Sequence, residues 1–229
     1  NKKNIIKKRS LKALVTAGPT REFIDPIRYI SNESSGKQGY EIADALNRLG
    51  IETTLITGPS SIVSNKDIRT KKIVTASEMF EAVKKSLPVD IAVCAAAVAD
   101  LKPVYKSKSK LKKDNLRLKS FELQKNIDIL EFLGKNNKHR PKIVIGFAAE
   151  TENLDKNALS KLKQKNCDII IANDISKKDS GFNSDYNRVS IIDNSGKIKV
   201  VKKNKKSFIA NIIADIILDK ILINDRSFN

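Results

Sequence analysis

The chain is poor in the residues that build metal sites, disulfide frameworks and aromatic stacking surfaces. Its 229 residues include two cysteines, one histidine and no tryptophan, and aromatic residues make up 5%. Because His139 is the single histidine, no spacing of cysteine and histidine indicates a zinc site. Cys94 and Cys167 lie inside apolar runs, which favours buried thiols in a reducing compartment. The scarcity of aromatic rings argues against stacking of single-stranded nucleic acid.

Long hydrophobic runs are missing as well. No stretch of about 18 apolar residues occurs, so we expect no membrane partner and a cytoplasmic location. Residues 1–10 are basic and lack the apolar segment of a secretion signal, so we expect a linker or the cut end of a longer chain there. A single domain is expected over residues 11–225, followed by a short tail over 226–229.

The charge is strongly of one sign. Lysine and arginine number 44 against 26 aspartates and glutamates, which gives a net charge of +18. The basic residues are spread over the start of the chain, over 102–119 and over 197–206, and isoleucine and asparagine are abundant throughout. We therefore expect anionic small-molecule ligands and no nucleic acid. The alternative is a nucleotide- or nucleic-acid-binding module without chemistry.

Apolar runs alternate with segments of helical spacing, which predicts a series of β–α units. Strands are expected over 11–15, 53–57, 72–75, 90–97, 142–147 and 168–172, and helices over 37–49, 78–86, 127–133, 154–165 and 207–222. Residues 188–193 and 197–201 predict a hairpin. Gly50 should end the first helix and Ser77 should cap the second. The fold class is α/β: a Rossmann-like, doubly wound, mostly parallel sheet with helices on both faces and a mixed C-terminal edge.

One segment, residues 101–124, is too long for an ordinary connection between a strand and a helix. It is rich in lysine and includes Lys110. A solvated basic loop is the simplest interpretation. The alternative, which we favour, is a flap whose lysines close over a phosphate-bearing ligand.

A polar loop, residues 25–39, lies between the first strand and the first helix. Its small residues could let backbone N–H groups reach an anion at the helix N-terminus; these residues are Ser34, Ser35, Gly36 and Gly39. Alternatively, Ser34 or Ser35 only caps the helix. In a parallel sheet this loop should converge with the loops 95–103, 146–152 and 172–174.

The polar side chains of these loops offer no nucleophilic triad, because His139 lies elsewhere. Asparagine, aspartate, lysine and backbone donors suit charge stabilisation, as in phosphoryl or nucleotidyl transfer. Asn32 could donate to an oxyanion, and Lys110 could neutralise a triphosphate. Asp100 could accept from a base or ribose or could cap a helix, and Glu150 could be a base or could start the next helix. The absence of a GxGxxG motif argues against a nicotinamide-dependent oxidoreductase.

Seven segments stand out when the chain is taken as a whole: Thr16-Ala-Gly-Pro-Thr-Arg-Glu22, Asp25 to Gly39, Ala95-Ala-Ala-Val-Ala-Asp100, Lys110-Leu-Lys-Lys113, Gly146-Phe-Ala-Ala-Glu-Thr151, Ala172-Asn-Asp174 and Gly181-Phe-Asn-Ser-Asp185. Together they resemble phosphopantothenoylcysteine synthetase of the bacterial, CTP-dependent type. In many bacteria this is the C-terminal half of a bifunctional coenzyme A biosynthesis flavoprotein. The resemblance implies possible fusion to a flavin-dependent decarboxylase, with no flavin in this domain.

The resemblance also implies the reaction. The carboxylate of 4′-phosphopantothenate attacks the α-phosphate of CTP, giving an acyl-cytidylate and pyrophosphate. The amine of L-cysteine then displaces CMP and forms an amide. Mg²⁺ accompanies the triphosphate, although the metal ligands are not implied, and the protein is a homodimer.

Carried over by position, the resemblance implies that Asn32 and Lys110 are catalytic. It places the phosphopantothenate at Arg28, Asn32, Ser34, Ser35, Gly36 and Ala97. It places CTP at Cys94, Ala95, Ala96, Asp100, Lys110, Ile127, Asp128, Ile129, Leu130, Phe147, Lys161 and Lys165. Glu150 receives no catalytic role, and Cys94 is a backbone contact rather than a nucleophile.

Overall fold

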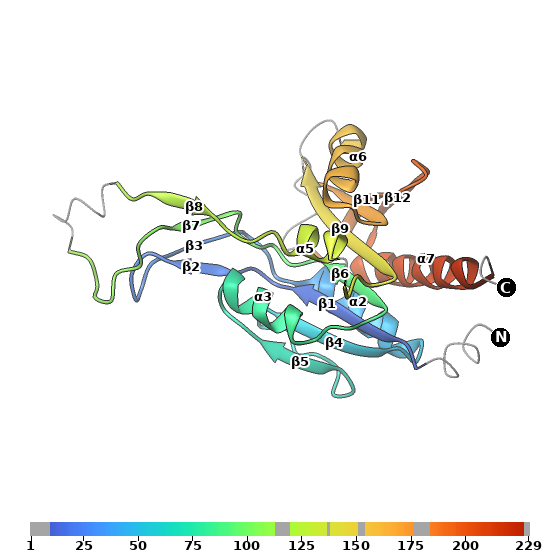
Figure 1. Ribbon diagram of the computed structural model, residues 1–229, viewed down its shortest axis with the longest axis horizontal. Coiled ribbons are helices and arrows are strands. Elements are labelled where there is room, and N and C mark those ends of the chain that lie inside the picture. The colour runs from blue at the N-terminus through green and yellow to red at the C-terminus, as the bar shows by residue number, and fades with distance from the viewer. Residues whose placement is uncertain (1–9, 113–119, 137, 151–153, 176–183, 227–229) are drawn as a thin grey trace.

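The structure is a computed structural model that describes residues 10–112, 120–136, 138–150, 154–175 and 184–226. It has a sheet-and-helix body and a thin arm that extends from one side of it (Figure 1). The predicted basic linker, part of the flap, the segment from Gly181 to Asn183 and the end of the tail lie outside the described residues. No helix in the described ranges combines the length and the apolar character that crossing a membrane requires.

The body is built on an eight-stranded sheet in the order β12-β11-β10-β9-β6-β1-β4-β5. Six strands pair in parallel: β1 (Lys12–Ala17), β4 (Glu52–Thr57), β5 (Arg69–Lys72), β6 (Ile91–Cys94), β9 (Ile143–Glu150) and β10 (Ile169–Asp174). At one edge β11 (Tyr186–Asp193) and β12 (Ile198–Lys205) add antiparallel. The chain passes from β1 to β4 on one side and returns to β6 on the other, so the winding reverses between β1 and β6. The predicted fold class is confirmed.

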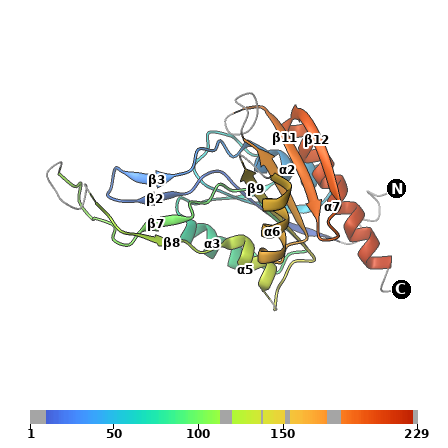
Figure 2. The same cartoon turned by 90° about the horizontal axis from the view of Figure 1, so that it is seen from above.

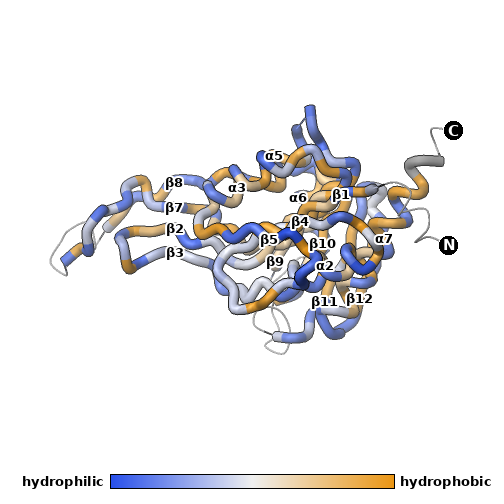
Figure 3. The backbone as a smooth tube through the Cα atoms, turned by 90° about the horizontal axis from the view of Figure 1, so that it is seen from below, coloured by the Kyte–Doolittle hydropathy of each residue, from blue (hydrophilic) through white to orange (hydrophobic). Residues whose placement is uncertain are grey.

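Helices cover both faces of the sheet because the strand residues alternate between two cores (Figures 1 and 2). On β1, Ala13 and Val15 face the core formed with α2 (Lys37–Arg48) and α7 (Lys206–Arg226). Leu14 faces the opposite core, which is formed with α3 (Ala76–Lys84), α5 (Ile129–Lys135) and α6 (Leu154–Lys165). Apolar residues accordingly concentrate along the strands of the body (Figure 3).

Helix ends explain where the predicted boundaries were right and where they were wrong. Gly50 follows α2 with a φ of 86° and closes it as predicted. Ser77 does not cap α3, because Thr75 and Glu78 form a reciprocal capping box that starts the helix earlier. The preceding strand was expected over 72–75 but runs over Arg69–Lys72, so that prediction was three residues too late. Asp128 likewise caps α5, so that helix starts two residues later than expected.

The arm consists of two antiparallel hairpins that run side by side in both views (Figures 1 and 2). One pairs β2 (Arg21–Phe23) with β3 (Tyr29–Ser31), and the other pairs β7 (Leu101–Pro103) with β8 (Leu123–Lys125). The predicted flap is thus a hairpin at its base rather than an irregular loop. Along both hairpins, hydrophobic residues are interspersed with hydrophilic ones (Figure 3). Several large apolar residues in this region are exposed: Ile27, Tyr29, Leu101, Val104, Tyr105, Phe121 and Leu123.

Candidate functional site

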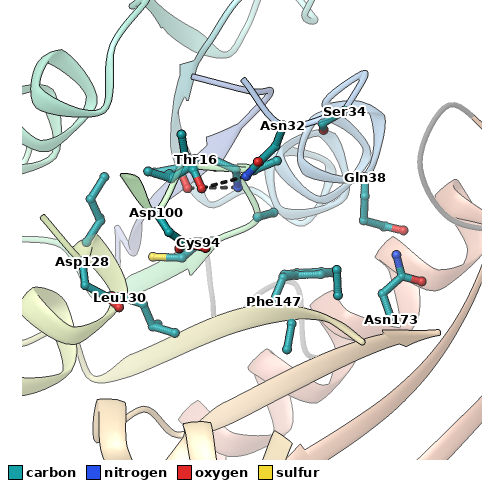
Figure 4. Close-up of a pocket in the computed structure, with 18 of the residues that line it drawn as sticks. Thr16, Asn32, Ser34, Gln38, Cys94, Asp100, Asp128, Leu130, Phe147 and Asn173 are labelled. Carbon is teal, nitrogen blue, oxygen red and sulfur yellow. Dashed lines mark hydrogen bonds between the residues drawn. The ribbon is translucent and has the colours of Figure 1, made fainter. Parts of the chain in front are cut away.

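A cavity of about 830 Å³ lies at the carboxyl ends of β1, β6, β9 and β10. This is the edge where the winding of the sheet reverses, the usual ligand position in doubly wound folds. All four loops that the sequence predicted to converge contribute to its lining, from Asn32, Cys94 to Asp100, Phe147 and Asn173. Figure 4 shows side chains from these loops around the cavity. The predicted convergence of the described parts of these loops is therefore confirmed.

The floor of the cavity is a backbone ladder that continues beyond the strands. Past the ends of β1 and β6, Pro19 and Ala97 form an isolated parallel bridge. The N–H of Ala97 donates to Gly18 at 2.9 Å, and its carbonyl accepts from Thr20 at 3.4 Å. The N–H of Ala99 donates to the Thr20 hydroxyl at 3.0 Å. Ala97 therefore has no N–H left for a ligand and can offer mainly its methyl group and its shape.

Asn32 projects over this floor (Figure 4). Its side-chain amide donates to the carbonyl of Val98 at 2.9 Å, which fixes the orientation of the side chain. An amide nitrogen has two N–H groups, so one remains for a ligand, as does the side-chain oxygen. The geometry agrees with a donor held ready for an oxyanion.

The N-terminus of α2 borders the same cavity. Gly36 is its N-cap with a φ of 80°, so the N-cap position itself has no side chain that could cap the helix, and no acidic residue lies in its first turn. Ser34 and Ser35 accept from the N–H groups of Gly36 at 3.2 Å and Lys37 at 3.4 Å. The N-cap is therefore Gly36 and neither serine, although Ser35 does accept from the first N–H of α2. The positive end of the helix dipole is left available to an anion.

At the opposite end of the cavity, Lys165 joins Asp128 at 2.9 Å and Glu131 at 2.8 Å. The hydrogen bond to Glu131 is the main cause of a raised Lys165 pKa. Hydrogen bonds from Lys135 and Lys165 lower the Glu131 pKa to about 2. The predicted nucleotide contacts Asp128 and Lys165 thus form one ion-paired group, and a nucleotide would have to share Lys165 with these carboxylates.

Further predicted nucleotide contacts lie where expected in the cavity lining. Lys161 pairs with Glu150 at 3.2 Å, which agrees with a structural role for that glutamate. Asp100 precedes the strand β7, so the alternative that it caps a helix is wrong. The remaining predicted contacts in the lining are Ala95, Ala96, Ile127, Ile129, Leu130 and Phe147.

The two thiols are poor nucleophiles. Burial raises the pKa of Cys94 far above its ordinary value, and burial raises the pKa of Cys167 to about 12. Cys94 does line the cavity, but its thiolate would be strongly disfavoured there. The structure therefore agrees with Cys94 as a position that shapes the cavity.

Arg28 and Lys110 are not brought to this cavity within the chain, because neither belongs to its lining. Both lie on the arm, where the buried carboxylate of Asp25 bonds to Arg28 and to the backbone beside Lys110. Asp25 pairs with the Arg28 guanidinium at 2.5 Å and accepts from the N–H of Leu111, next to Lys110, at 3.2 Å. Burial by itself would raise the Asp25 pKa, but these bonds and those from the N–H groups of Ile27 and Arg28 lower it. Asp25 therefore fastens the β2–β3 turn to the flap.

Sequence reasoning missed several polar residues of the lining, among them Gln38, Asn173, Asn187 and Lys206. All four are buried. Gln38 and Asn173 face each other at the end of the cavity away from Asp128 (Figure 4). Asn173 lay within a segment singled out from the sequence, and burial of a polar residue at a strand end could have identified it. Lys206 gave no such signal among its neighbouring lysines.

Comparisons with known proteins place these features in a family context. The family described as DNA/pantothenate metabolism flavoprotein, C-terminal domain, matches residues 8–221. Coenzyme A biosynthesis bifunctional protein CoaBC of Haemophilus influenzae is 40% identical over 210 residues, and that of Escherichia coli K12 is 39% identical over 218. These matches cover 91% and 93% of this chain but 52% of each relative. The chain thus spans about half the length of the curated relatives it matches.

Solved structures agree with this match. The crystal structure of the C-terminal domain of CoaBC superposes with a TM-score of 0.77 at 35% identity, covering 94% of this chain and 96% of that chain. The DNA/pantothenate metabolism flavoprotein from Streptococcus pneumoniae gives a TM-score of 0.74 at 24% identity, covering 92% and 99%. The second structure supports the fold alone.

Proposed function

Because the chain belongs to the family of DNA/pantothenate metabolism flavoprotein C-terminal domains, we propose that it is a ligase of coenzyme A biosynthesis. It joins 4′-phosphopantothenate to L-cysteine and cleaves CTP to CMP and pyrophosphate. The single observation that carries the proposal is the cavity at the switch point, whose lining includes Asn32, the N-terminus of α2 and the predicted nucleotide contacts other than Lys110.

In the first step, a carboxylate oxygen of phosphopantothenate forms a bond to the α-phosphorus of CTP, and the bond from that phosphorus to the bridging oxygen breaks. Pyrophosphate leaves with the electron pair, and an acyl-cytidylate remains. The positive end of α2 would favour the negative charge that the phosphates bring. The Asp128 and Lys165 pair would hold the nucleotide at the opposite end of the cavity.

In the second step, the amine nitrogen of cysteine bonds to the acyl carbon and the bond to the cytidylate oxygen breaks. The amine loses a proton, and CMP leaves. Negative charge develops on the acyl oxygen, and the remaining N–H of Asn32 would donate to it. The hydrogen bond to Val98 orients Asn32 in advance, so little reorganisation is needed during the reaction.

Mg²⁺ would enter with the triphosphate and neutralise part of its charge. Among the described residues no group of three histidine, cysteine, aspartate or glutamate side chains is placed to hold a metal ion. Asp100 and Asp128 do line the cavity. This donor set fits an ion carried mainly by phosphate oxygens and water, with one or two carboxylates at most.

The arm supports a homodimer as part of the proposal. Its exposed apolar side chains, such as Ile27 and Tyr105, lie on two thin hairpins, which are marginally stable alone. Arg28 and Lys110 on the arm do not line the cavity of their own chain. A second copy could cover the apolar surface and bring these side chains to a cavity. Fusion to a flavin-dependent decarboxylase domain would account for the greater length of the relatives.

Pyrophosphate release tests the reaction and the nucleotide. Purified protein is incubated with 4′-phosphopantothenate and Mg²⁺, with CTP or ATP, and with or without cysteine. Release with CTP that continues to full turnover only with cysteine supports the proposal. Release with ATP alone retains the ligase and contradicts the CTP preference, and no release from folded protein favours the binding module.

Variants test the two catalytic assignments separately. Asn32→Ala should allow pyrophosphate release but stall amide formation, and normal amide formation would contradict its role. Lys110→Ala should block pyrophosphate release, whereas Lys108→Ala, an exposed change on the same flap, should not. Equal rates for the two lysine variants would remove Lys110 from the activation step.

A further inference from the structure

The end of the cavity formed by Gln38, Asn173 and Lys206 has no role in the proposed reaction so far. These residues come from α2, β10 and α7. Figure 4 shows Gln38 and Asn173 on the same side of the cavity, and Gln38 contacts the backbone of Lys206. Lys206 is 4% exposed, which is unusual for a lysine without a carboxylate partner. It is the first residue of α7.

The backbone of Lys206 is firmly held. Its N–H donates to the carbonyl of Asp185 at 2.9 Å, and its carbonyl accepts from the Gln38 side chain at 3.2 Å. The ammonium group, in contrast, makes no hydrogen bond or ion pair with any residue that the structure describes. The nearby carboxylate of Asp185 pairs with Lys37 at 2.6 Å instead.

The charge of Lys206 is therefore poorly compensated within the chain. Burial, together with the neighbouring Lys37, lowers its pKa to about 8, while Asp185 opposes the effect. A buried cation without a partner is costly, so its presence beside a cavity suggests that a ligand supplies the missing anion.

A second observation points the same way. The positive end of α2 borders the cavity with no acidic residue in its first turn. The side-chain oxygens of Gln38 and Asn173 are buried and have no hydrogen-bond partner in the described part of the chain. Because amide oxygens accept hydrogen bonds, they would pair with a water molecule or a hydroxyl group of the ligand and not with its anionic oxygens. This end of the cavity is thus composed of polar groups that the protein alone leaves unsatisfied, which is expected where a ligand and its bound water complete the structure.

We infer that Lys206 and the N-terminus of α2 together form a binding site for a phosphate group of a substrate. The inference rests on the proposed function for the identity of the substrates. Two sources carry the same chemistry: the terminal phosphates of the nucleotide and the 4′-phosphate of phosphopantothenate. In either case Lys206 is a binding residue that complements the helix terminus, and it takes no part in proton transfer.

Binding measured without turnover tests the inference. Calorimetry with the whole chain compares CTP with CMP, phosphopantothenate with pantothenate, and tripolyphosphate alone, for wild type and Lys206→Met. Methionine keeps the length of the buried side chain and removes its charge. Lys205→Met, at an exposed neighbouring position, is the matched control. Lys206→Gln provides a second variant that keeps a polar end.

We expect Lys206→Met and Lys206→Gln to lower the affinity for one phosphate-bearing ligand by at least about tenfold, because each variant loses one charged hydrogen bond. Lower affinity for CTP and tripolyphosphate, with unchanged affinity for CMP, would assign the site to the nucleotide. Lower affinity for phosphopantothenate, with unchanged affinity for pantothenate, would assign it to that substrate.

Unchanged affinity for every phosphate-bearing ligand would overturn the inference, as would an equal loss in Lys205→Met. A loss confined to the KM for cysteine would also overturn it, because the site would then hold a carboxylate. If the wild type and the Lys206 variants bind CTP and phosphopantothenate with equal affinity, only this inference fails. If the wild type binds neither, the proposed function fails.

Discussion

Replacing Gly36 by alanine, compared with replacing Gly196, should separate the cost of backbone strain from the cost of a steric clash at the mouth of the cavity. Gly36 has a φ of 80°, and a Cβ at this position would lie 2.8 Å from the Gly18 nitrogen and 2.9 Å from the Gly18 Cα. Gly196 has a φ of 79°, but a Cβ there would meet nothing within 4 Å. Gly196→Ala therefore carries the backbone strain alone, and Gly36→Ala carries the strain together with a clash between two backbone segments.

The magnitudes follow from these geometries. An alanine held in the left-handed region costs about 1–2 kcal/mol, which is the expected loss for Gly196→Ala. Overpacking adds about 1–3 kcal/mol at Gly36, where the obstacle is backbone that cannot rotate away. The gain from a stiffer unfolded chain is the same in both variants and cancels in their difference. Gly36→Ala should thus lower the free energy of unfolding by roughly 1–3 kcal/mol more than Gly196→Ala does.

Urea unfolding of both variants, followed by circular dichroism, measures the difference directly. Because Gly36 borders the cavity, Gly36→Ala should also weaken binding of CTP or phosphopantothenate, whereas Gly196→Ala should leave both affinities unchanged. Equal stabilities for the two variants, within about 0.5 kcal/mol, would refute the clash and with it the close approach of α2 to the end of β1.

Three further outcomes are expected. The folded-state pKa of Lys206 is about 8, against an ordinary 10.5, so the charged form is disfavoured in the folded protein. Lys206→Met should therefore raise the free energy of unfolding by about 2–3 kcal/mol below pH 8. Denaturation measured across pH 7–10.5 should show that this gain shrinks as the pH rises. Asp25→Asn should release the flap and slow pyrophosphate formation while the exposed control Asp67→Asn does not, and an unchanged rate would contradict the fastening role. Iodoacetamide at pH 8 should label Cys94 and Cys167 only after unfolding, because burial raises both pKa values, and mass spectrometry would reveal any labelling of the folded chain.

The sheet could be predicted because each strand has a recognisable local sequence pattern. The run from Ile169 to Ile171 is apolar on both faces, as buried parallel strands require, and Gly50 marks the end of α2 by its backbone conformation. The convergence of the loops then follows from topology, since parallel strands end at one edge. These features depend on neighbours within a few residues, which a single sequence displays.

The arm and the far end of the cavity could not be predicted in the same way. Strands β2 and β7 have three residues each, too short for an alternating pattern, and a buried carboxylate at Asp25 fastens the two hairpins together. Lys206 belongs to a run of lysines that look alike in sequence. Only the start of α7 at that residue turns one of them inward, and this depends on contacts with Asp185 and Gln38 far away in the chain.

The ladder between Pro19 and Ala97 and the hairpins beyond it would respond differently to insertions during evolution. A one-residue shift in the ladder would displace the floor beneath Asn32, so its register is tightly constrained. The hairpins contribute no strand to the eight-stranded sheet, so their lengths can diverge between lineages while the sheet keeps its pairing. A redesign of this scaffold for a different acid or amine should therefore leave the floor unchanged and vary the arm only outside Asp25, Arg28 and Lys110.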